Sequence, residues 1–431
     1  MAELTPGTKV KLRNGSSCTV KKELGRGGQG IVYQVDYQGH DYALKWYTQN
    51  FIDEAKFYSN LENNVKQGAP TPNFLWPEAV TEKAFGSFGY LMKLRPKGYE
   101  EVGMFMMAKV KFPSVNVLLD ACLQICSAFQ QLHILGYSYQ DMNDGNFFIN
   151  PQTGHVLICD NDNVAPHGTN MGIAGKGGYM APEIVDGEKL PDIYTDYFSL
   201  SVILFILIFM NRPFEGAKAI SCPCLTTNAE KILNGKNSVF ILDPSDNSNR
   251  PVNGIHTNVI QRWPLFPALI RDAFVKTFSK EAMHTPEKRV MEKEWLKWLV
   301  QSRSMYAKCP VCGRETFHNI SADTSKCIEC GRTFQHVPFL EVGRYRIPLT
   351  PEQKIYSCHI SSDKEYGKVI GEIITNPQNP AKKAIRNLSS FEWQAITPDN
   401  KFRTISPQGV IPLIPGVTIK FSKDTSGIIK L

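Results

Sequence analysis

The spacing of hydrophobic and polar positions changes twice along the chain and divides it into three stretches. Up to about residue 94, short apolar runs between glycine turns predict strands, among them 41–47 and 88–94, with one helix at 52–65. In the second stretch, apolar residues recur at steps of four and three, as on one face of an amphipathic helix: Leu118, Cys122, Ile125, Phe129 and Leu132.

The rest of the second stretch predicts a loop, two strands and a long connection. A polar loop at 139–146 precedes short apolar runs at 147–149 and 156–158. Residues 160–183 are rich in Gly and Asn and have no periodicity. The most apolar run, 198–210, is shorter than the roughly 18 residues of a membrane span, so we expect a buried core helix.

The third stretch begins after residue 301 and predicts two small β-rich parts. Residues 305–336 are Cys-rich and strand-like, and from 339 onward no long amphipathic pattern occurs. Short strand candidates alternate there with Pro, Gly, Asn and Asp turns, at 345–347, 369–374, 411–413 and 417–421. The fold class expected is therefore multidomain α+β, ending in an all-β, sandwich-like domain at 338–431.

Composition and charge exclude several classes of protein. Hydrophobic residues make up 42% of the chain and charged residues 21%, as in ordinary globular proteins. The net charge of +7 lies entirely after residue 302, where 18 Lys/Arg face 11 Asp/Glu. This mild excess is typical of a solvated surface, so we expect neither a nucleic-acid ligand nor a membrane.

Eleven cysteines and the N-terminal sequence bear on localisation. An odd number of cysteines with CxxC spacing favours reduced thiols. The chain does not start with a basic segment followed by an apolar run, so we expect no signal peptide. A cytoplasmic location is the prediction.

Six short motifs in a fixed order suit the handling of a nucleotide. Glycines let backbone N–H groups approach phosphates, a lysine adds a fixed charge, and Asn and Asp oxygens suit Mg²⁺. The motifs are Gly25-Arg26-Gly27-Gly28-Gln29-Gly30-Ile31-Val32, Ala43-Leu44-Lys45, Tyr139-Gln140-Asp141, Asn146, Asp160 and Ala181-Pro182-Glu183. In this order and spacing they resemble a protein kinase over residues 15 to about 300.

The resemblance implies a bilobal kinase domain at 1–302, with an N-lobe at 1–94 and a C-lobe at 95–302. It implies ATP with Mg²⁺ or Mn²⁺ and a protein substrate. Asp141 would orient the attacking hydroxyl, and Lys45 would bridge the α- and β-phosphates. The remaining nucleotide-binding positions would be Gly25, Gly27, Gly28, Gly30, Val32 and Ala43.

Several residues would complete this site. Asn146 and Asp160 would be the magnesium ligands, with Asp162 as a second candidate beside Asp160. For the carboxylate partner of Lys45, Glu54 and Glu62 compete, and we prefer Glu54 as the catalytic member.

Two further contacts are expected outside the nucleotide site. Glu183 is expected to pair with Arg289. Asp196 is expected to cap the apolar helix and to brace the catalytic loop.

The chain departs from the kinase pattern at two positions. Gln140 replaces an arginine that, in the kinase pattern, would bind a phosphate group on the activation segment (residues 160–183). Without this arginine, no such phosphate could be bound here. Asn143 replaces the lysine that would neutralise the γ-phosphate, at a cost of several kcal/mol by analogy with roughly 3–4 for an oxyanion donor. Lys176 is a candidate substitute. An ATP-binding pseudokinase scaffold is therefore an alternative function.

The stretches 141–148 and 159–164 resemble divergent bacterial serine/threonine kinases associated with tellurium-resistance-type stress operons. This resemblance implies a stress-response role and two partners. One would be a von Willebrand A-type metal-binding protein, and the other a metal-dependent protein phosphatase.

Two CxxC-Gly units separated by 14 residues predict a metal site. Two residues between cysteines let both sulfurs reach one metal, and four sulfurs complete a tetrahedral shell. The ligands would be Cys309, Cys312, Cys327 and Cys330. Zn²⁺ is the expected metal, with rubredoxin-like iron as the alternative. We expect a structural zinc ribbon at 303–337, and a zinc-ribbon nucleic-acid-binding stress protein is a third possible function.

The segments 387–390 and 414–421 loosely resemble a forkhead-associated-type sandwich. Such domains bind phosphothreonine through Arg, Ser and Asn on loops, and Arg344, Arg386 and Ser389 are candidates. A plain docking module is an equal alternative.

Overall fold

A computed structural model describes residues 3–49, 51–224, 226–318, 324–335, 337–351 and 353–431. The chain divides into two compact units. The first comprises Met1–Phe112, Gln124–Val259 and Phe274–Lys293, and the second comprises Pro113–Leu123, Ile260–Ala273 and Glu294–Leu431.

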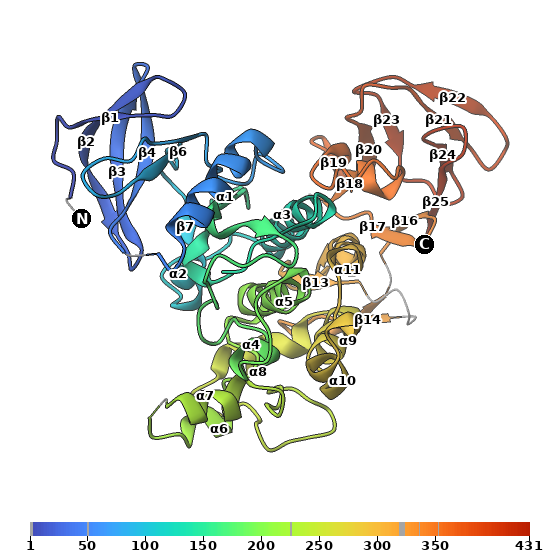
Figure 1. Cartoon of the computed structure of the whole chain (residues 1–431). Helices are drawn as coiled ribbons and strands as arrows, with labels where there is room; N and C mark the ends of the chain where they lie inside the picture. The colour runs from blue at the N-terminus through green and yellow to red at the C-terminus, as the bar shows by residue number, and fades with distance from the viewer. Residues whose placement is uncertain (1–2, 50, 225, 319–323, 336, 352) are drawn as a thin grey trace. The chain divides into compact units, whose positions relative to one another are not determined.

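The first unit begins with an antiparallel six-stranded sheet, drawn in blue in Figure 1, whose strand order is β1-β2-β3-β4-β6-β5. One face packs on a core that includes Val20, Ile31, Leu44 and Trp46. The strands are β1 (Lys9–Lys11), β2 (Ser17–Arg26), β3 (Gly30–Tyr37), β4 (His40–Tyr47), β5 (Ala79–Val80) and β6 (Gly89–Lys93). The strands predicted at 41–47 and 88–94 are thus found as β4 and β6.

Helix α1 (Glu54–Gln67) follows β4 and starts two residues later than the sequence predicted. The Asp53 carboxylate accepts a hydrogen bond from the Lys56 backbone N–H at 2.9 Å and so fixes the first turn. Phe57, Asn60, Leu61 and Asn64 are its buried residues.

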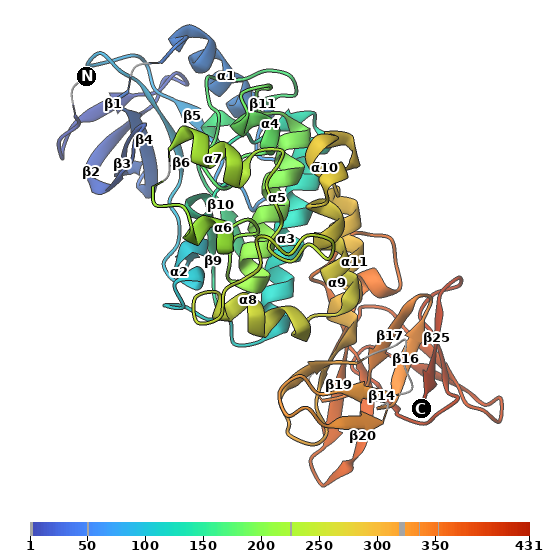
Figure 2. The ribbon, with the colours of Figure 1, turned by 90° about the horizontal axis from the view of Figure 1, so that it is seen from below.

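The rest of the first unit is mainly helical, and Figure 2 shows α5 (Ile193–Phe209) running through its interior. Every residue from Phe198 to Phe209 is buried, which confirms a core helix in the most apolar run. The other helices wholly in this unit are α2 (Val102–Met106), α4 (Pro182–Val185), α6 (Ala217–Ile220), α7 (Thr227–Asn234) and α10 (Lys280–His284).

Short strands and 3₁₀ turns carry the loops of this part. Strands β9 and β10 coincide with the predicted ranges. The strands are β7 (Glu100–Glu101), β8 (Tyr137–Ser138), β9 (Phe147–Ile149), β10 (Val156–Ile158) and β11 (Ala165–Pro166). The 3₁₀ turns used below are η1 (Asp144–Asn146) and η2 (Asn161–Asn163).

Four helices contribute residues to both units: α3 (Val115–Ile134), α8 (Thr257–Arg262), α9 (Ala268–Thr277) and α11 (Glu292–Met305). Helix α3 contains the predicted apolar stripe. Among the described residues it alone is long and apolar enough to cross a membrane, but 56% of its most apolar window is buried in the structure. A single such helix is equally typical of a protein core.

The second unit contains two short hairpins. One hairpin joins β12 (Tyr306–Lys308) to β13 (Glu315–Phe317), and the other joins β14 (Thr324–Lys326) to β15 (Thr333–Gln335).

Two further sheets follow, with strand orders β17-β16-β25-β24-β21-β22 and β18-β19-β20-β23. Trp393 on β21 lies against Gly371 on β19, where a Cβ would meet the ring at 2.9 Å, so the two sheets pack on each other. The strands are β16 (Phe339–Val342), β17 (Tyr345–Pro348), β18 (Lys354–Tyr356), β19 (Val369–Asn376), β20 (Asn379–Asn387), β21 (Trp393–Ile396), β22 (Phe402–Ile405), β23 (Val410–Pro412), β24 (Thr418–Lys420) and β25 (Ser426–Lys430).

Candidate active site

The loop between β8 and β9 holds Asp141 in a network of side-chain amides. Asn146 donates from Nδ2 to the Asp141 carbonyl at 2.8 Å, and Asn143 donates to the same carbonyl at 3.2 Å. The Asn143 Oδ1 accepts from the Gly145 N–H at 3.0 Å and caps the η1 turn. Asn143 therefore stabilises the loop at the position where the sequence lacks a lysine.

Asp141 lies in a largely buried setting that changes its pKa. Burial raises the pKa of Asp141 to about 6, and the negative charge of Asp160 adds to the increase. A carboxylate with this pKa can still be ionised at neutral pH and accept a proton from a hydroxyl.

Asn146 and Asp160 offer the oxygen donors that a hard cation prefers. The Cys159 N–H donates to the Asn146 carbonyl at 2.9 Å, which places Asp160 next to the loop. Asn146 uses its amide nitrogen for Asp141, and among the described residues no contact occupies its Oδ1. Asp160 is 41% exposed and adopts a left-handed backbone with φ 52°, a rare conformation for a residue other than glycine. An amide oxygen and a carboxylate at this place fit Mg²⁺.

Lys45 lies on β4, opposite Val32 of β3, with 5% of its side chain exposed. Its Nζ lies 2.8 Å from Asp162 Oδ2 and 3.5 Å from Asp160 Oδ1, and it donates to Gln29 Oε1 at 2.9 Å. Burial alone would lower the pKa of Lys45, but the two carboxylates raise it above its usual range. The amine is therefore a fixed positive charge.

The partner expected for Lys45 is not the one that the structure shows. Glu54 lies in the exposed first turn of α1 and pairs with Lys83 at 2.5 Å. The alternative, Glu62, pairs with Arg13 at 3.0 Å. Neither carboxylate belongs to the inward stripe of α1, which carries Phe57, Leu61 and two asparagines. The contact partner is Asp162, which the sequence reasoning considered only as a metal ligand.

The glycines of the β2–β3 turn differ in what surrounds them. A Cβ added at Gly25, Gly27 or Gly28 would meet no atom within 4 Å, so a ligand can approach their backbone. At Gly30 a Cβ would lie 2.2 Å from the Trp46 carbonyl, so packing within the sheet requires this glycine. Val32 and Ala43 contact the same hydrophobic cluster on neighbouring strands.

Asp196 braces the catalytic loop, as expected. Its carboxylate accepts from the backbone N–H of Tyr139 at 2.6 Å and of Gln140 at 3.0 Å. The expectation that Asp196 caps α5 is wrong. Asp192 takes that place and forms a capping box with Thr195, because the helix begins at Ile193, five residues earlier than the apolar run suggests.

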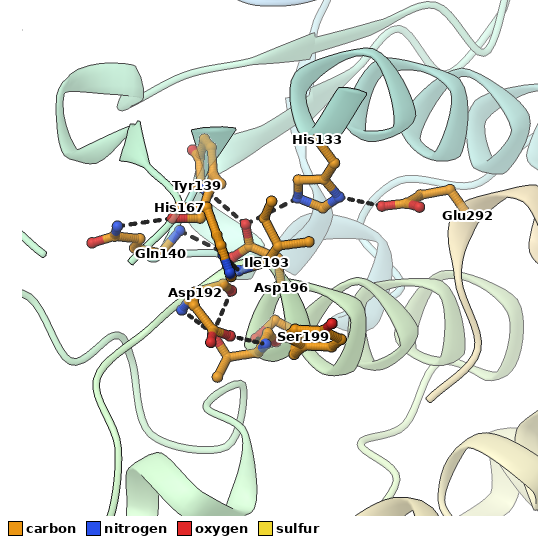
Figure 3. Close-up of polar contacts among 12 residues, drawn as sticks. His133, Tyr139, Gln140, His167, Asp192, Ile193, Asp196, Ser199 and Glu292 are labelled. Carbon is orange, nitrogen blue, oxygen red and sulfur yellow. Dashed lines mark hydrogen bonds and ion pairs between the residues drawn. The ribbon is translucent and has the colours of Figure 1, made fainter. Parts of the chain in front are cut away.

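Figure 3 shows His133 of α3 between two carboxylates, Asp196 of α5 and Glu292 of α11. Its Nε2 lies 3.1 Å from Asp196, and its Nδ1 is hydrogen-bonded to Glu292. Although burial lowers the pKa of His133, the two carboxylates raise it to about 9. The imidazolium thus holds Asp196 in the orientation that braces the loop.

This buried charge gives stability a pH dependence. Because the pKa rises from 6.5 to about 9 on folding, the contribution is complete below pH 6.5 and disappears as pH rises through 9. Its size is about 3 kcal/mol. We expect His133→Gln to lower the midpoint of urea unfolding at pH 6.5 and the difference from wild type to shrink by pH 9.5. An equal difference at both pH values would contradict a charged His133.

The segment after Asp160 is fastened to the catalytic loop by neutral hydrogen bonds. Gln140 donates to the Thr169 carbonyl at 2.6 Å and accepts from Asn170 Nδ2 at 2.9 Å. Gln140 thus occupies the arginine position and binds the segment directly. Nearby, Lys176 Nζ lies 2.7 Å from Asp144 Oδ1, next to Asn143 in the loop.

The pair expected between Glu183 and Arg289 is present. Arg289 donates to both carboxylate oxygens, at 2.8 and 2.6 Å, and both side chains are buried. A bidentate pair of this kind fixes the end of the activation segment.

The second unit contains a four-cysteine cluster formed by Cys309, Cys312, Cys327 and Cys330, whose sulfurs all lie within 4.8 Å of one another. The distances from Cys309 to Cys330 and from Cys312 to Cys327 are 4.0 and 3.7 Å. A tetrahedron with Zn–S bonds of about 2.3 Å has S···S edges of about 3.8 Å. The donor set therefore fits a tetrahedral metal.

The two halves of the cluster repeat one local structure. The N–H of Val311 donates to Cys309 Sγ, and that of Glu329 donates to Cys327 Sγ, each at 3.4 Å. Gly313 and Gly331 follow with φ of 72° and 68°. This left-handed backbone favours glycine and explains why a glycine follows each CxxC pair.

The candidates for phosphothreonine binding in the last domain are already engaged. Ser389 donates to the Asn387 side chain at 2.6 Å, and Asn387 is buried. Arg386 pairs with Glu372 at 3.1 Å, and Arg344 donates to the Tyr345 hydroxyl at 3.0 Å. Each of the three candidates thus has a partner within the domain.

Comparison with known proteins gives a family and several relatives. Residues 18–249 match the family model described as "Protein kinase domain". Protein kinase YegI of Escherichia coli (strain K12) is 24% identical over 366 residues, 78% of this chain and 52% of that protein. Protein kinase C delta type of Mus musculus is 27% identical over 224 residues, 49% of this chain and 32% of that protein.

A shorter match is to serine/threonine-protein kinase Sgk1 of Xenopus tropicalis, 30% identical over 128 residues, 26% of this chain and 30% of that protein. The chain spans about half the length of YegI and about a third of the other two. The family model covers more than half of the 431 residues, within the part that holds Lys45, Asp141 and Asp160. The chain belongs to the protein kinase family.

Proposed function

We propose that this chain is a serine/threonine protein kinase that transfers the γ-phosphoryl group of Mg-ATP to a protein hydroxyl. One observation supports this most: within the first unit Asn146 is hydrogen-bonded to the Asp141 carbonyl and to the backbone of Cys159, and the next residue, Asp160, lies 3.5 Å from Lys45 Nζ. This supplies a base, oxygen ligands and a fixed charge in one place.

Each group has a separate task in this proposal. Asp141 accepts the proton of the substrate hydroxyl, whose oxygen attacks the γ-phosphorus while the bond to the ADP oxygen breaks. Asn146 and Asp160 would hold Mg²⁺, which neutralises phosphate charge. Lys45 pairs with the phosphates, and the backbone at Gly25, Gly27 and Gly28 is open to them.

The missing loop lysine leaves a place for a second cation near the γ-phosphate, and Lys176 is the described residue best placed to supply it. It is held at the η1 turn by Asp144 and is half exposed, so it can reach a ligand. We expect Lys176→Ala to lower the rate of transfer at saturating ATP by about tenfold or more. Lys176→Arg, which keeps the charge, should retain most of the rate. Equal rates for wild type and Lys176→Ala would contradict this role.

We also propose that the four-cysteine cluster holds a structural Zn²⁺, since four sulfurs close the shell and leave no position for a substrate. The ribbon and the final β-domain would then recruit the substrate protein. The stress-operon role, the von Willebrand A-type protein and the phosphatase stay predictions from the family resemblance.

The test is transfer of labelled γ-phosphate with Mg²⁺ or Mn²⁺. Acceptors would be the chain itself, myelin basic protein and any protein encoded beside it. Label on a serine or threonine would support the proposal. ATP binding without transfer to any acceptor would favour the pseudokinase scaffold and identify Asn143 as its cause.

A further inference from the structure

We infer that Asp162 is the positioning residue for Lys45, in the place that a carboxylate on helix α1 would otherwise take. This inference rests on the proposed function, because it assigns a role within the same nucleotide site. It begins with the contact between Lys45 Nζ and Asp162 Oδ2, at 2.8 Å the shortest that the amine makes.

Asp162 is built for a fixed position. Its side chain has no exposed surface, and it lies in the η2 turn directly after Asp160 and Asn161. The Tyr47 hydroxyl donates to the same Oδ2 at 2.6 Å. Tyr47 is itself buried and contacts Phe51, Phe57 and Phe88. Two donors on one oxygen, both from β4, hold the carboxylate against the strand that carries Lys45.

Helix α1 contributes to this site without a carboxylate. Among its described residues the inward polar groups are Asn60 and Asn64, and both donate to the carbonyl of Val164, at 2.8 and 2.9 Å. Val164 lies two residues after Asp162. Helix α1 therefore holds the segment that carries Asp162 through neutral hydrogen bonds. The negative charge that pairs with Lys45 comes from Asp162 in that segment.

This arrangement has a consequence for regulation. Where a helix supplies the lysine's partner, movement of that helix breaks the pair. Here the pair lies between β4 and the η2 turn, so we expect displacement of the first turn of α1 to leave Lys45 in place. Of the two carboxylates of that helix, Glu54 is exposed and pairs with Lys83, and Glu62 is half-buried and pairs with Arg13.

The test measures binding of a fluorescent ATP analogue with Mg²⁺ and does not require phosphoryl transfer. Lys45→Met and Asp162→Asn are each expected to weaken binding by about tenfold. Since both act through one amine, the double variant should bind no more weakly than Lys45→Met, within about twofold. Glu82→Gln, which removes an exposed carboxylate elsewhere in the same lobe, is the matched control.

Three outcomes would overturn the inference. Wild-type affinity in Asp162→Asn would show that Lys45 needs no such partner. Multiplied losses in the double variant would indicate that Asp162 acts separately, as a metal ligand. A tenfold loss in Glu54→Gln or Glu62→Gln would return the role to the helix.

A folding defect in Asp162→Asn would be seen as a lowered melting temperature. Tyr47→Phe then replaces it: it removes one hydrogen bond to Asp162 and should weaken binding a fewfold, whereas unchanged binding would count against the inference. Glu54→Gln and Glu62→Gln change residues at the surface of α1, so their binding measurements stay informative.

A wild type that binds nucleotide but transfers no phosphate would end the proposed function and leave this inference standing. Absence of nucleotide binding would end both.

Discussion

Asp141→Asn is expected to abolish phosphoryl transfer while Mg-ATP still binds with nearly wild-type affinity. The change keeps the shape of the side chain and removes the proton acceptor, and a positioned base contributes about 10²–10⁴-fold to rate. Asp160→Ala is expected to lose transfer to a similar extent and also the Mg²⁺-dependence of nucleotide binding, because it removes the exposed carboxylate beside Asn146. Initial rates and binding isotherms with and without Mg²⁺ measure both.

The two variants are expected to differ in nucleotide binding, because only Asp160→Ala should lose its dependence on Mg²⁺. Glu287→Gln, at an exposed carboxylate far along the chain from the loop, is the control for a surface change. If Asp141→Asn kept more than a tenth of the wild-type rate, Asp141 would not be the base. If Asp160→Ala kept Mg²⁺-dependent binding, the metal would have other ligands, and Asp162 would be the next candidate.

Replacement of Cys309 by serine is expected to abolish the proposed metal binding and to unfold the two hairpins at 306–317 and 324–335. Among the described residues of this part, the hydrophobic cluster comprises Cys309, Cys327 and Phe334, which is a small core for two hairpins. Metal binding in comparable four-ligand peptides supplies about 10–16 kcal/mol. We expect one Zn²⁺ per wild-type chain by elemental analysis, none in Cys309→Ser, and rapid hydrogen exchange across the two hairpins in the variant.

A matched control is Cys224→Ser, because Cys224 is an exposed cysteine outside the cluster and should leave metal content unchanged. Removal of metal from the wild type by a strong chelator should reproduce the exchange pattern of Cys309→Ser. Iron in place of zinc would support the rubredoxin-like alternative. Full metal content in Cys309→Ser would contradict a four-sulfur site.

The elements of the first unit were predictable because each depends on a local pattern. The continuous apolar runs at 147–149 and 156–158, which predicted strands, are found as β9 and β10, because a short apolar run can be recognised without a distant partner. Helix α1 starts two residues later than predicted, because its first turn depends on one side-chain cap at Asp53. The spacing of the four cysteines was equally local, and their sulfurs meet as the two CxxC units suggested.

Contacts between segments far apart in the chain were not predictable in the same way. Glu54 was preferred for Lys45 because it begins the right helix, yet the direction in which a helix residue points depends on how the helix packs. Glu54 lies three residues before Phe57 and seven before Leu61, so helical spacing alone places it near the inward stripe and could not exclude it. The sequence contained no sign that Asp162, 117 residues beyond Lys45, would be its partner.

The sequence by itself determined the order of the glycine turn, Lys45, Asp141 and the pair Asn146 and Asp160, because each lies within a few residues of a turn or strand end. The tertiary structure alone decided which charges meet. It paired Lys45 with Asp162 and set His133 between Asp196 and Glu292. Burial is the physical reason: a buried charge must find a partner among the groups that packing brings within reach, and packing is a property of the whole fold.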